Sequence, residues 1–222
     1  MFAGAFWYRQ EHSPSPILPL ALLKQRQFAV VNGLNLLYGA AAFGIFSLVP
    51  LYAQTRFGMP PLEAGALLAI RAAAMAVMST VTALLILQRF GYRRPMLAGF
   101  VLVALGLLML SVSPALISGF AWLTVSCVVC GLGIGLAGPP SNNASLQLMP
   151  TEIAAISGLR ATFRQTGGII SISIAAAVIA GSAAGPRVLP YVFTTLAVLT
   201  VIGAPAIIGV PENPNPLNAP RT

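Results

Sequence analysis

The stretch CVVCGLGIGLAGPP, residues 127–140, decides between a soluble enzyme and a membrane protein. It contains a Cys-x-x-Cys pair, Cys127 and Cys130, and its glycines follow Gly-x-Gly-x-x-Gly, the pattern of a dinucleotide-binding turn. Such a turn needs a preceding strand and an acidic residue about 20 residues further on. Here the glycines end an apolar run that begins near Ala115, and the next acid, Glu152, comes too early. We therefore expect no enzymatic role, no cofactor and no bound metal.

The same stretch fits a membrane helix that packs closely against its neighbours. Gly131 and Gly135 are four residues apart, so they share one helix face, where another backbone can approach. The two cysteines are expected to be small apolar packing residues, because a reactive thiolate needs an accessible and electropositive environment. Pro139 and Pro140 are expected to end or bend this helix near the cytoplasmic face.

The composition of the whole chain excludes a soluble fold. Of the 222 residues, 57% are hydrophobic and only 7% are charged, against about 25% charged residues in typical soluble proteins. The chain contains no aspartate, and its four acidic residues are Glu11, Glu63, Glu152 and Glu212. These proportions predict an all-α integral membrane protein.

Six stretches are long and apolar enough to cross a bilayer, which requires about 20 residues for about 30 Å of hydrocarbon. The expected spans are Phe28–Tyr52, Ala64–Leu87, Pro95–Val112, Ala115–Pro139, Thr166–Ala184 and Leu189–Val210. Helices are expected because they satisfy every backbone polar group internally. The chain would then consist of a cytoplasmic connecting segment, residues 1–27, a six-helix bundle, residues 28–210, and a cytoplasmic tail, residues 211–222.

The basic residues predict the orientation of these spans. Nine of them fall on the side of the two termini: Arg9, Lys24, Arg26, Arg89, Arg93, Arg94, Arg160, Arg164 and Arg221. Arg56 and Arg187 lie on the other side, and Arg71 lies inside the second span. The positive-inside rule therefore places both termini in the cytoplasm of a multi-pass plasma (inner) membrane protein. The net charge of +8 is interpreted as a topology signal, and no nucleic-acid partner is expected.

The segment QRFGYRRP, residues 88–95, is a candidate cytoplasmic gate loop between the second and third spans. Positive-inside charge and a glycine turn explain most of its composition. It also resembles the short cytoplasmic loop of the major facilitator superfamily, of the form Gly-x-x-x-Asp-Arg-x-Gly-x-Arg-Arg. The matching residues are Arg89, Gly91, Arg93 and Arg94. Leu84 replaces the first glycine and Gln88 the acid, as fits the weaker copy of the loop in a C-terminal half.

Four further segments extend this resemblance over nearly the whole chain. LVPLYAQTRFGMPPLEAGALL (48–68), GLGIGLAGPP (131–140), ISGLRATFRQTGGIISISIAAAV (156–178) and SPSPILPLALLKQRQF (13–28) are similar to segments of drug:proton antiporters of the EmrB/QacA type, a fourteen-span class. The resemblance implies that the chain is one half of a major facilitator fold, with substrate held between two halves. Each such half usually contains two inverted three-helix repeats.

The function implied by the resemblance is proton-coupled efflux of drugs or other amphipathic small molecules by alternating access. The expected partners are a small-molecule substrate, protons, the lipid bilayer, and either an N-terminal half or a second copy. Proton coupling normally requires an ionisable group within the membrane, and none of the four glutamates lies well inside a span. The coupling acid is therefore expected in the other half. A non-transporting remnant or a regulatory or assembly subunit is the alternative.

Four polar residues within the spans are candidates for the substrate cavity. Arg71, about 12 Å into the second span, either lines the cavity as a cation or bonds to backbone carbonyls and snorkels outward. Asn32, Asn35 and Tyr38 recur every three residues of the first span and drift slowly around one helix face. They either line a water-filled cavity or bond to neighbouring helices, and the second interpretation is favoured.

Two further sets lie toward the cytoplasmic side. Arg160 and Arg164 are four residues apart on an expected helix, so they share a face. They either hold the two halves together in one state of the transport cycle or contact lipid headgroups. Asn142, Asn143 and Gln147 follow the two prolines and are expected to be solvated loop residues.

Overall fold

The computed structural model describes residues 26–112, 118–146 and 153–210, and no strand occurs within these ranges. Six helices in this part of the chain have the length and hydropathy needed to cross a membrane. They are Phe28–Phe57, Pro61–Phe90, Arg93–Ser111, Gly119–Leu146, Ile156–Gly181 and Gly185–Gly209. The prediction of an all-α membrane fold is therefore confirmed. Apart from residues 26 and 27, the expected connecting segment and tail lie outside the described residues.

The first two spans run in opposite directions and are joined by a short turn. Helix α3, Arg26–Phe57, forms the first span and contains Pro50. The second span consists of α4, Pro61–Val81, a π-helical turn η1, Thr82–Ile86, and α5, Leu87–Phe90. Proline suits the first turn of α4 because its missing N–H would have no helical partner there.

The segment expected as a gate loop is mostly helical. Only Gly91 and Tyr92 separate α5 from α6, Arg93–Ser111. Gly91 has a φ of 67°, a backbone conformation that glycine adopts without steric cost. The short turn places Arg89 and Arg94 on helix ends at the surface.

The fourth and fifth spans are longer at one end than expected. Helix α7, Gly119–Leu146, continues through Pro139 and Pro140. These prolines were expected to end or bend the helix, and the first of these alternatives is wrong. Prolines are tolerated inside membrane helices because neighbouring groups satisfy the freed carbonyls. Helix α8, Ile153–Gly181, begins well before the expected Thr166, because its first turns carry arginines that lower the hydropathy without breaking the helix.

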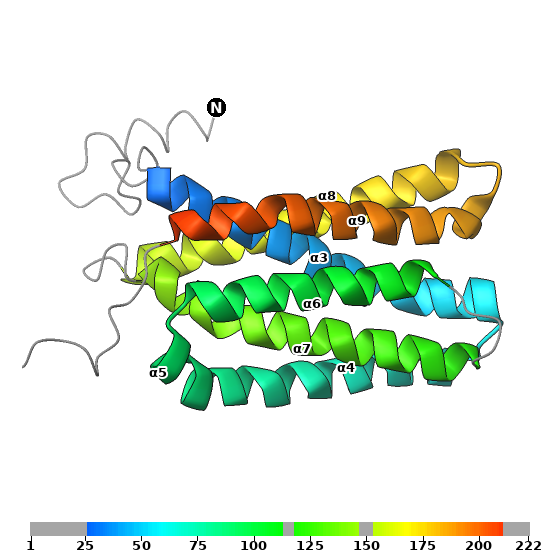
Figure 1. Cartoon of the computed structure of the whole chain (residues 1–222). Coiled ribbons are helices and arrows are strands. Elements are labelled where there is room, and N and C mark those ends of the chain that lie inside the picture. The colour runs from blue at the N-terminus through cyan, green and yellow to red at the C-terminus, as the bar shows by residue number, and fades with distance from the viewer. Residues whose placement is uncertain (1–25, 113–117, 147–152, 211–222) are drawn as a thin grey trace, which may run out of the picture.

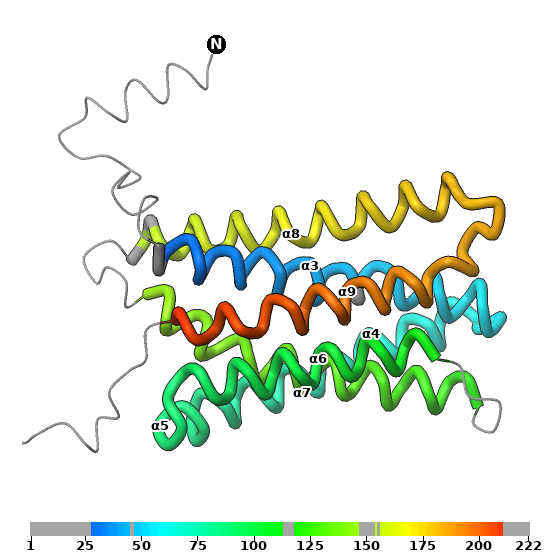
Figure 2. The backbone as a smooth tube through the Cα atoms, turned by 45° about the horizontal axis from the view of Figure 1, so that its top comes forward, coloured from blue at the N-terminus to red at the C-terminus, as the bar shows by residue number. Residues whose placement is uncertain are grey.

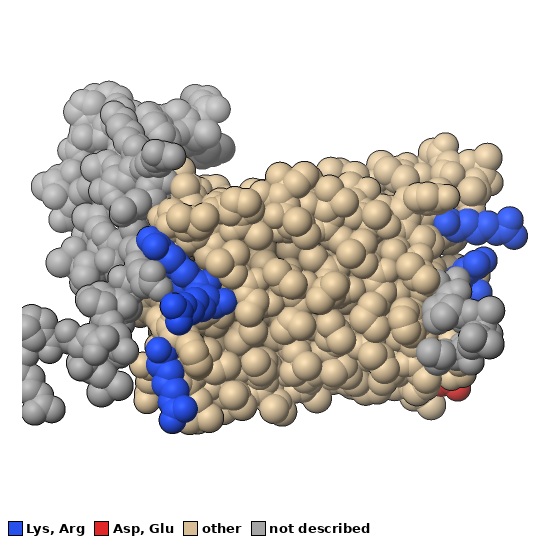
Figure 3. All heavy atoms as spheres, viewed as in Figure 1, with Lys and Arg blue, Asp and Glu red and all other residues tan. Residues whose placement is uncertain are grey.

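The sixth span combines three segments in sequence. They are the 3-10 turn η2, Gly185–Val188, the helix α9, Leu189–Gly203, and a second 3-10 segment η3, Ala204–Gly209. We call the end of the bundle that holds the Gly91 turn and Val210 the proximal end, and the opposite end the distal end. Figure 3 shows charged side chains at both ends of the visible face and an uncharged band between them.

The helices pack in pairs, α3 against α8, α4 against α7, and α6 against both α7 and α9 (Figures 1 and 2). In span order, the first contacts the fifth and the second contacts the fourth. If spans one, two and three are exchanged with spans four, five and six, the contact between spans one and five becomes the contact between spans four and two. Two inverted three-helix repeats produce this pattern, although the sequence shows no clear repeat.

Glycines allow the closest of these contacts. A Cβ atom added to Gly39 of α3 or to Gly167 of α8 would overlap a backbone carbonyl of the facing helix. Gly131 and Gly135 of α7 both face α4, where an added Cβ would lie 2.5 Å from a backbone oxygen. Such interfaces of small residues are typical of membrane helices.

The two cysteines of the same helix are buried and carry free thiols. Cys127 and Cys130 are both 0% exposed and belong to the apolar core. A Cβ atom on Gly106 of α6 would meet the Cys130 sulfur and backbone. The cysteines are thus placed in tight contact between helices.

Candidate functional site: a basic cavity

A cavity of about 600 Å³ opens in the proximal half of the bundle, and its walls come from α3, α4 with η1, α7 and α8. We call it the basic cavity. Its polar lining residues are Tyr38, Ser79, Thr80, Asn142, Asn143, Arg160 and Arg164. The volume falls within the range of about 300–1,000 Å³ that is typical of small-molecule sites.

The charge of the basic cavity is positive. Arg160 and Arg164 line it from successive turns of α8, and no acidic residue lines it within the described part of the chain. The Arg164 guanidinium carbon lies 4.8 Å from the centre of the Tyr38 ring and 5.8 Å from that of Phe43. Cation–π attraction therefore holds Arg164 against α3.

Arg160 is positioned differently. Its Nε atom is buried and finds no hydrogen-bond partner within the described residues. A buried donor without an acceptor is destabilising by about 1–3 kcal/mol. A ligand or a second protein surface that brought an acceptor to Arg160 would remove this cost.

The proline pair of α7 shapes another wall of the cavity. Pro139 and Pro140 have no N–H, so the carbonyls of Gly135 and Leu136, four residues earlier, lack their usual helical donor. Gly135 and Pro139 line the basic cavity. The wall that α7 contributes therefore includes a helical turn that lacks its regular backbone hydrogen bonds.

Two asparagines extend this wall by one helical turn. Asn142 and Asn143 belong to α7 and line the basic cavity. The expectation that they are solvated loop residues is therefore wrong, and the reason is that α7 does not end at the prolines. Gln147, the third residue expected to be a solvated loop residue, lies outside the described residues.

The polar residues of the first span mainly connect helices. Asn35 accepts a hydrogen bond from the Ser141 hydroxyl at 3.1 Å, and the Tyr38 hydroxyl donates to the Ile134 carbonyl at 2.9 Å. Asn32 donates to a carbonyl of its own helix at 3.0 Å. Of these predicted cavity residues, Tyr38 lines the basic cavity, whereas Asn32 and Asn35 are buried in the packing between helices.

Arg71 lies deep in the bundle and not in the lining of the basic cavity. Its side chain is 6% exposed, and its Nη1 atom donates to the Ala42 carbonyl of α3 at 3.0 Å. The structure therefore places it in the carbonyl-bonded arrangement, where it connects α4 with α3.

The residues of the expected gate loop lie at the proximal end, apart from the lining of the basic cavity. The Arg93 Nε atom donates to the Val210 carbonyl at 2.9 Å and so connects the start of α6 to the end of η3. Arg89 and Arg94 are exposed, and Gly91 forms the turn between α5 and α6.

Sequence reasoning missed the contribution of α4 and its continuation. Ser79 and Thr80 line the basic cavity, and so does Ala83 of η1. A π-helical turn is often found at functional sites. The signal in the sequence is the pair of Ser79 and Thr80, in an expected span whose other polar residues are Arg71 and Thr82.

Comparisons with known proteins agree with this architecture. The profile described as Major Facilitator Superfamily matches residues 8–172. The chain is 28% identical over 176 residues to "Multidrug resistance protein Stp" of Mycobacterium tuberculosis, covering 79% of this chain and 32% of that protein. It is 28% identical over 174 residues to the "Tetracenomycin C resistance and export protein" of Streptomyces glaucescens, covering 78% of this chain and 32% of that protein.

A third relative is "Multidrug transporter protein MdtP" of Bacillus subtilis, which is 24% identical over 186 residues, with 82% of this chain and 34% of that protein covered. The chain thus spans about a third of the length of the curated relatives it matches. The profile match covers most of the chain. The described residues contain six helices that are long and apolar enough to span a membrane, as one half of this fold requires. The chain therefore belongs to the major facilitator superfamily, whose members are multi-pass membrane transporters and not enzymes.

Proposed function

We propose that this chain is the C-terminal half of a proton-coupled exporter of drugs or other amphipathic small molecules, of the fourteen-span EmrB/QacA type. It works by alternating access, with the basic cavity as its share of the substrate site. The proximal end, which holds Arg89, Arg93 and Arg94, faces the cytoplasm of a plasma (inner) membrane.

The observation that carries the proposal is the position of the basic cavity on the least buried side of the bundle. Helices α4 and α8 both line the cavity. Only 11% of the most apolar window of the second span is buried, and 22% of that of the fifth, against 50–56% in the first, third and fourth spans. In the sixth span, which does not line the cavity, 28% of that window is buried. A second half placed against α4 and α8 would close the cavity and cover these two helices.

The printed names of the relatives support an export role. They describe multidrug resistance, multidrug transport and resistance with export of an antibiotic. The matched segment makes up about a third of each of these relatives, so each of them has room for a second half outside the match.

The coupling acid lies in the other half under this proposal. Glu63, the acidic residue among the described positions, is exposed in the first turn of α4 at the distal end. It is far from the proximal cavity along that helix. An acid of the other half that approached Arg160 and Arg164 would supply the missing negative charge and the group that binds the proton.

The test is ethidium efflux from cells that express the chain alone or together with the coding sequence that adjoins it in its genome. We expect efflux only from the combined protein, and we expect a protonophore to abolish it. Membrane abundance, measured by immunoblot in both strains, serves as the control.

Other outcomes contradict the proposal in distinct ways. Efflux from the chain alone would mean that two copies form the transporter. Failure of the combined protein to transport any of a panel of dyes, at normal abundance, would favour a non-transporting remnant or a regulatory subunit.

A further inference from the structure

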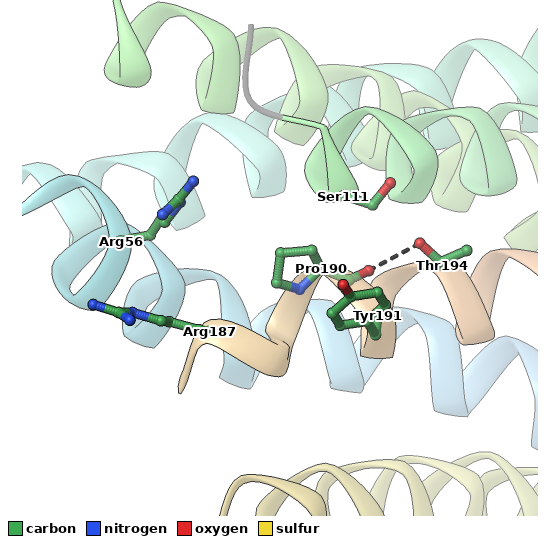
Figure 4. Close-up of a pocket in the computed structure, with 6 residues that line it drawn as sticks. All are labelled: Arg56, Ser111, Arg187, Pro190, Tyr191 and Thr194. Atoms are coloured by element: carbon green, nitrogen blue, oxygen red, sulfur yellow. Dashed lines mark hydrogen bonds between the residues drawn. The ribbon is translucent and has the colours of Figure 1, made fainter. Parts of the chain in front are cut away.

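A second cavity, of about 340 Å³, lies at the distal end of the bundle, and we call it the distal cavity. It is lined by Arg56, Ser111, Arg187, Pro190, Tyr191 and Thr194 (Figure 4). Arg56 lies in the last turn of α3 and Arg187 lies in η2, so exposed arginines from two separate segments line one cavity. Figure 4 shows both arginines on one side of the cavity, opposite Ser111 and Thr194.

The distal cavity has the charge of an anion-binding site. No acidic residue lines it within the described part of the chain, and Glu63 lies outside its lining. Guanidinium groups match phosphate oxygens with paired N–H donors. Arg56 also interacts with the Tyr52 hydroxyl, but a guanidinium has five N–H donors, so this contact leaves donors for a ligand.

An apolar groove adjoins the distal cavity. Its volume is about 450 Å³, it runs between α3, α8 and α9, and it shares Tyr191 with the distal cavity. Helices α8 and α9 are joined at the distal end but contact each other little along their length. Apart from Ser171 and Thr195, the groove is walled by apolar and small side chains and by Tyr191.

The groove is slightly shorter than the hydrocarbon layer of one bilayer leaflet. Along α9 it extends from Tyr191 to Leu199, which corresponds to about 12 Å at 1.5 Å per residue. Half of a hydrocarbon core of about 30 Å is about 15 Å. Tyr191 itself is 75% exposed, as is typical of tyrosines that lie at the level of lipid headgroups.

From these observations we infer that the distal cavity and the apolar groove together form a binding site for an anionic phospholipid. The phosphate group lies between Arg56 and Arg187, and an acyl chain passes Tyr191 and lies in the groove along α8 and α9. The site is separate from the basic cavity and does not depend on the transport activity proposed above. Its ligand is a structural lipid of the leaflet at the distal end.

Native mass spectrometry of the purified full chain in detergent tests this inference. The probes are phosphatidylglycerol and phosphatidylcholine with identical acyl chains. We expect phosphatidylglycerol to bind at about tenfold lower concentration, because its net negative charge is not offset by a choline cation. The double substitution Arg56→Gln and Arg187→Gln is expected to remove this preference, whereas Arg94→Gln, which changes an exposed proximal arginine, is expected to keep it.

A second pair of measurements tests the groove. Ile174, in the groove wall, is 59% exposed, so Ile174→Trp is expected to fold and to weaken binding of phosphatidylglycerol. Dodecyl phosphate is expected to compete for the site, and inorganic phosphate in the same excess is not. Thermal unfolding of each variant is measured in parallel, so that a folding defect is recognised as such.

Three results would overturn the inference. The first is equal binding of the two phospholipids, and the second is an unchanged preference after both arginines are replaced by glutamine. The third is displacement of phosphatidylglycerol by inorganic phosphate, which would reduce the site to an anion pocket without a lipid.

Discussion

Buried polar side chains in this bundle bind mainly to backbone carbonyls. Arg71 donates to the carbonyl of Ala42 and Tyr38 to that of Ile134, each across a helix interface. A carbonyl already engaged in a helix retains a second lone pair, so it can accept such a bond without loss of the helix. At the residue scale, these bonds fix the register of α3 against α4 and α7.

The Tyr38 hydroxyl can be removed without disturbing its ring. Tyr38→Phe is expected to lower the free energy of unfolding by about 1 kcal/mol, because one interhelical hydrogen bond is lost. The ring would still face the Arg164 guanidinium. The measurement is thermal unfolding in detergent, followed with a thiol-reactive dye that labels Cys127 and Cys130 on exposure. Tyr38→Ala, which also removes the ring, is expected to lower the free energy of unfolding further than Tyr38→Phe does. If both variants lowered it equally, the contact between the ring and Arg164 would contribute nothing to stability.

Gly39 and Gly33 of α3 form a matched pair for testing close packing. A Cβ atom on Gly39 would overlap the Arg164 backbone carbonyl of α8, whereas a Cβ on Gly33 meets no atom within 4 Å. Gly39→Ala is expected to destabilise the bundle by about 1–3 kcal/mol through overpacking. Gly33→Ala is expected to be neutral or to stabilise by up to about 1 kcal/mol through helix propensity. The same thiol assay compares the two, and identical melting temperatures would contradict the observed contact between α3 and α8.

At the scale of the element, hydropathy predicts the spans but not their full length. The segment before Thr166 carries Arg160 and Arg164 and therefore scores as a loop, although α8 already begins at Ile153. Likewise Pro139 and Pro140 suggest an end for α7 that the structure does not show. Hydropathy reports which residues lipid can surround. Polar helical turns beyond them depend on contacts with other helices, which no single stretch of sequence contains.

The sequence identifies several polar residues of the basic cavity but does not predict that they meet there. Tyr38, Arg160 and Arg164 were each recognised as unusual polar residues, yet they were assigned to different sites. Tyr38 and Arg164 are distant in sequence. Only the packing of α3 against α8 brings the Arg164 guanidinium carbon to 4.8 Å from the centre of the Tyr38 ring. Local spacing can identify a polar face on one helix, but it does not say which faces meet.

The continuation of α7 past its prolines can be measured by cysteine accessibility. In a Cys127→Ser, Cys130→Ser background, Asn142→Cys and Asn143→Cys are expected to react with a membrane-impermeant thiol reagent, because both positions line the basic cavity. Cysteines at positions 141, 144 and 145 are expected to be protected, since Ser141, Ala144 and Ser145 are buried. Labelling rates along 141–145 should therefore follow a helical period. Uniform labelling would show that the segment is a loop.

At the scale of the whole molecule, the packing of the helices in pairs determines where the basic cavity lies. The pairs α3–α8 and α4–α7 are related by exchange of the first three and last three spans. The basic cavity lies where these two pairs meet, with walls from all four helices. Two inverted three-helix repeats would place these four helices together in this way, and the remaining helices α6 and α9 pack against α7 and α3.

The last prediction concerns the positive charge of the basic cavity in the combined two-half protein. Arg160 has a buried Nε donor without an acceptor in the described residues, so we expect the other half or the substrate to supply one. Arg160→Gln should then lower the rate of proton-driven dye efflux by about tenfold, because one charge-assisted hydrogen bond is lost. Membrane abundance should stay unchanged. Arg160→Lys should restore part of the rate because it keeps the charge but loses the planar fork.

The matched control is Arg94→Gln, which removes an equal charge from an exposed position at the proximal end. Because Arg94 is exposed and does not line the basic cavity, its loss should change efflux by less than about twofold. That result would also count against the gate role expected of Arg94 from the sequence. If Arg160→Gln and Arg94→Gln reduced efflux equally, the effect would not be specific to the basic cavity. If Arg160→Gln lowered abundance and efflux in parallel, Arg160 would stabilise the bundle and take no part in transport.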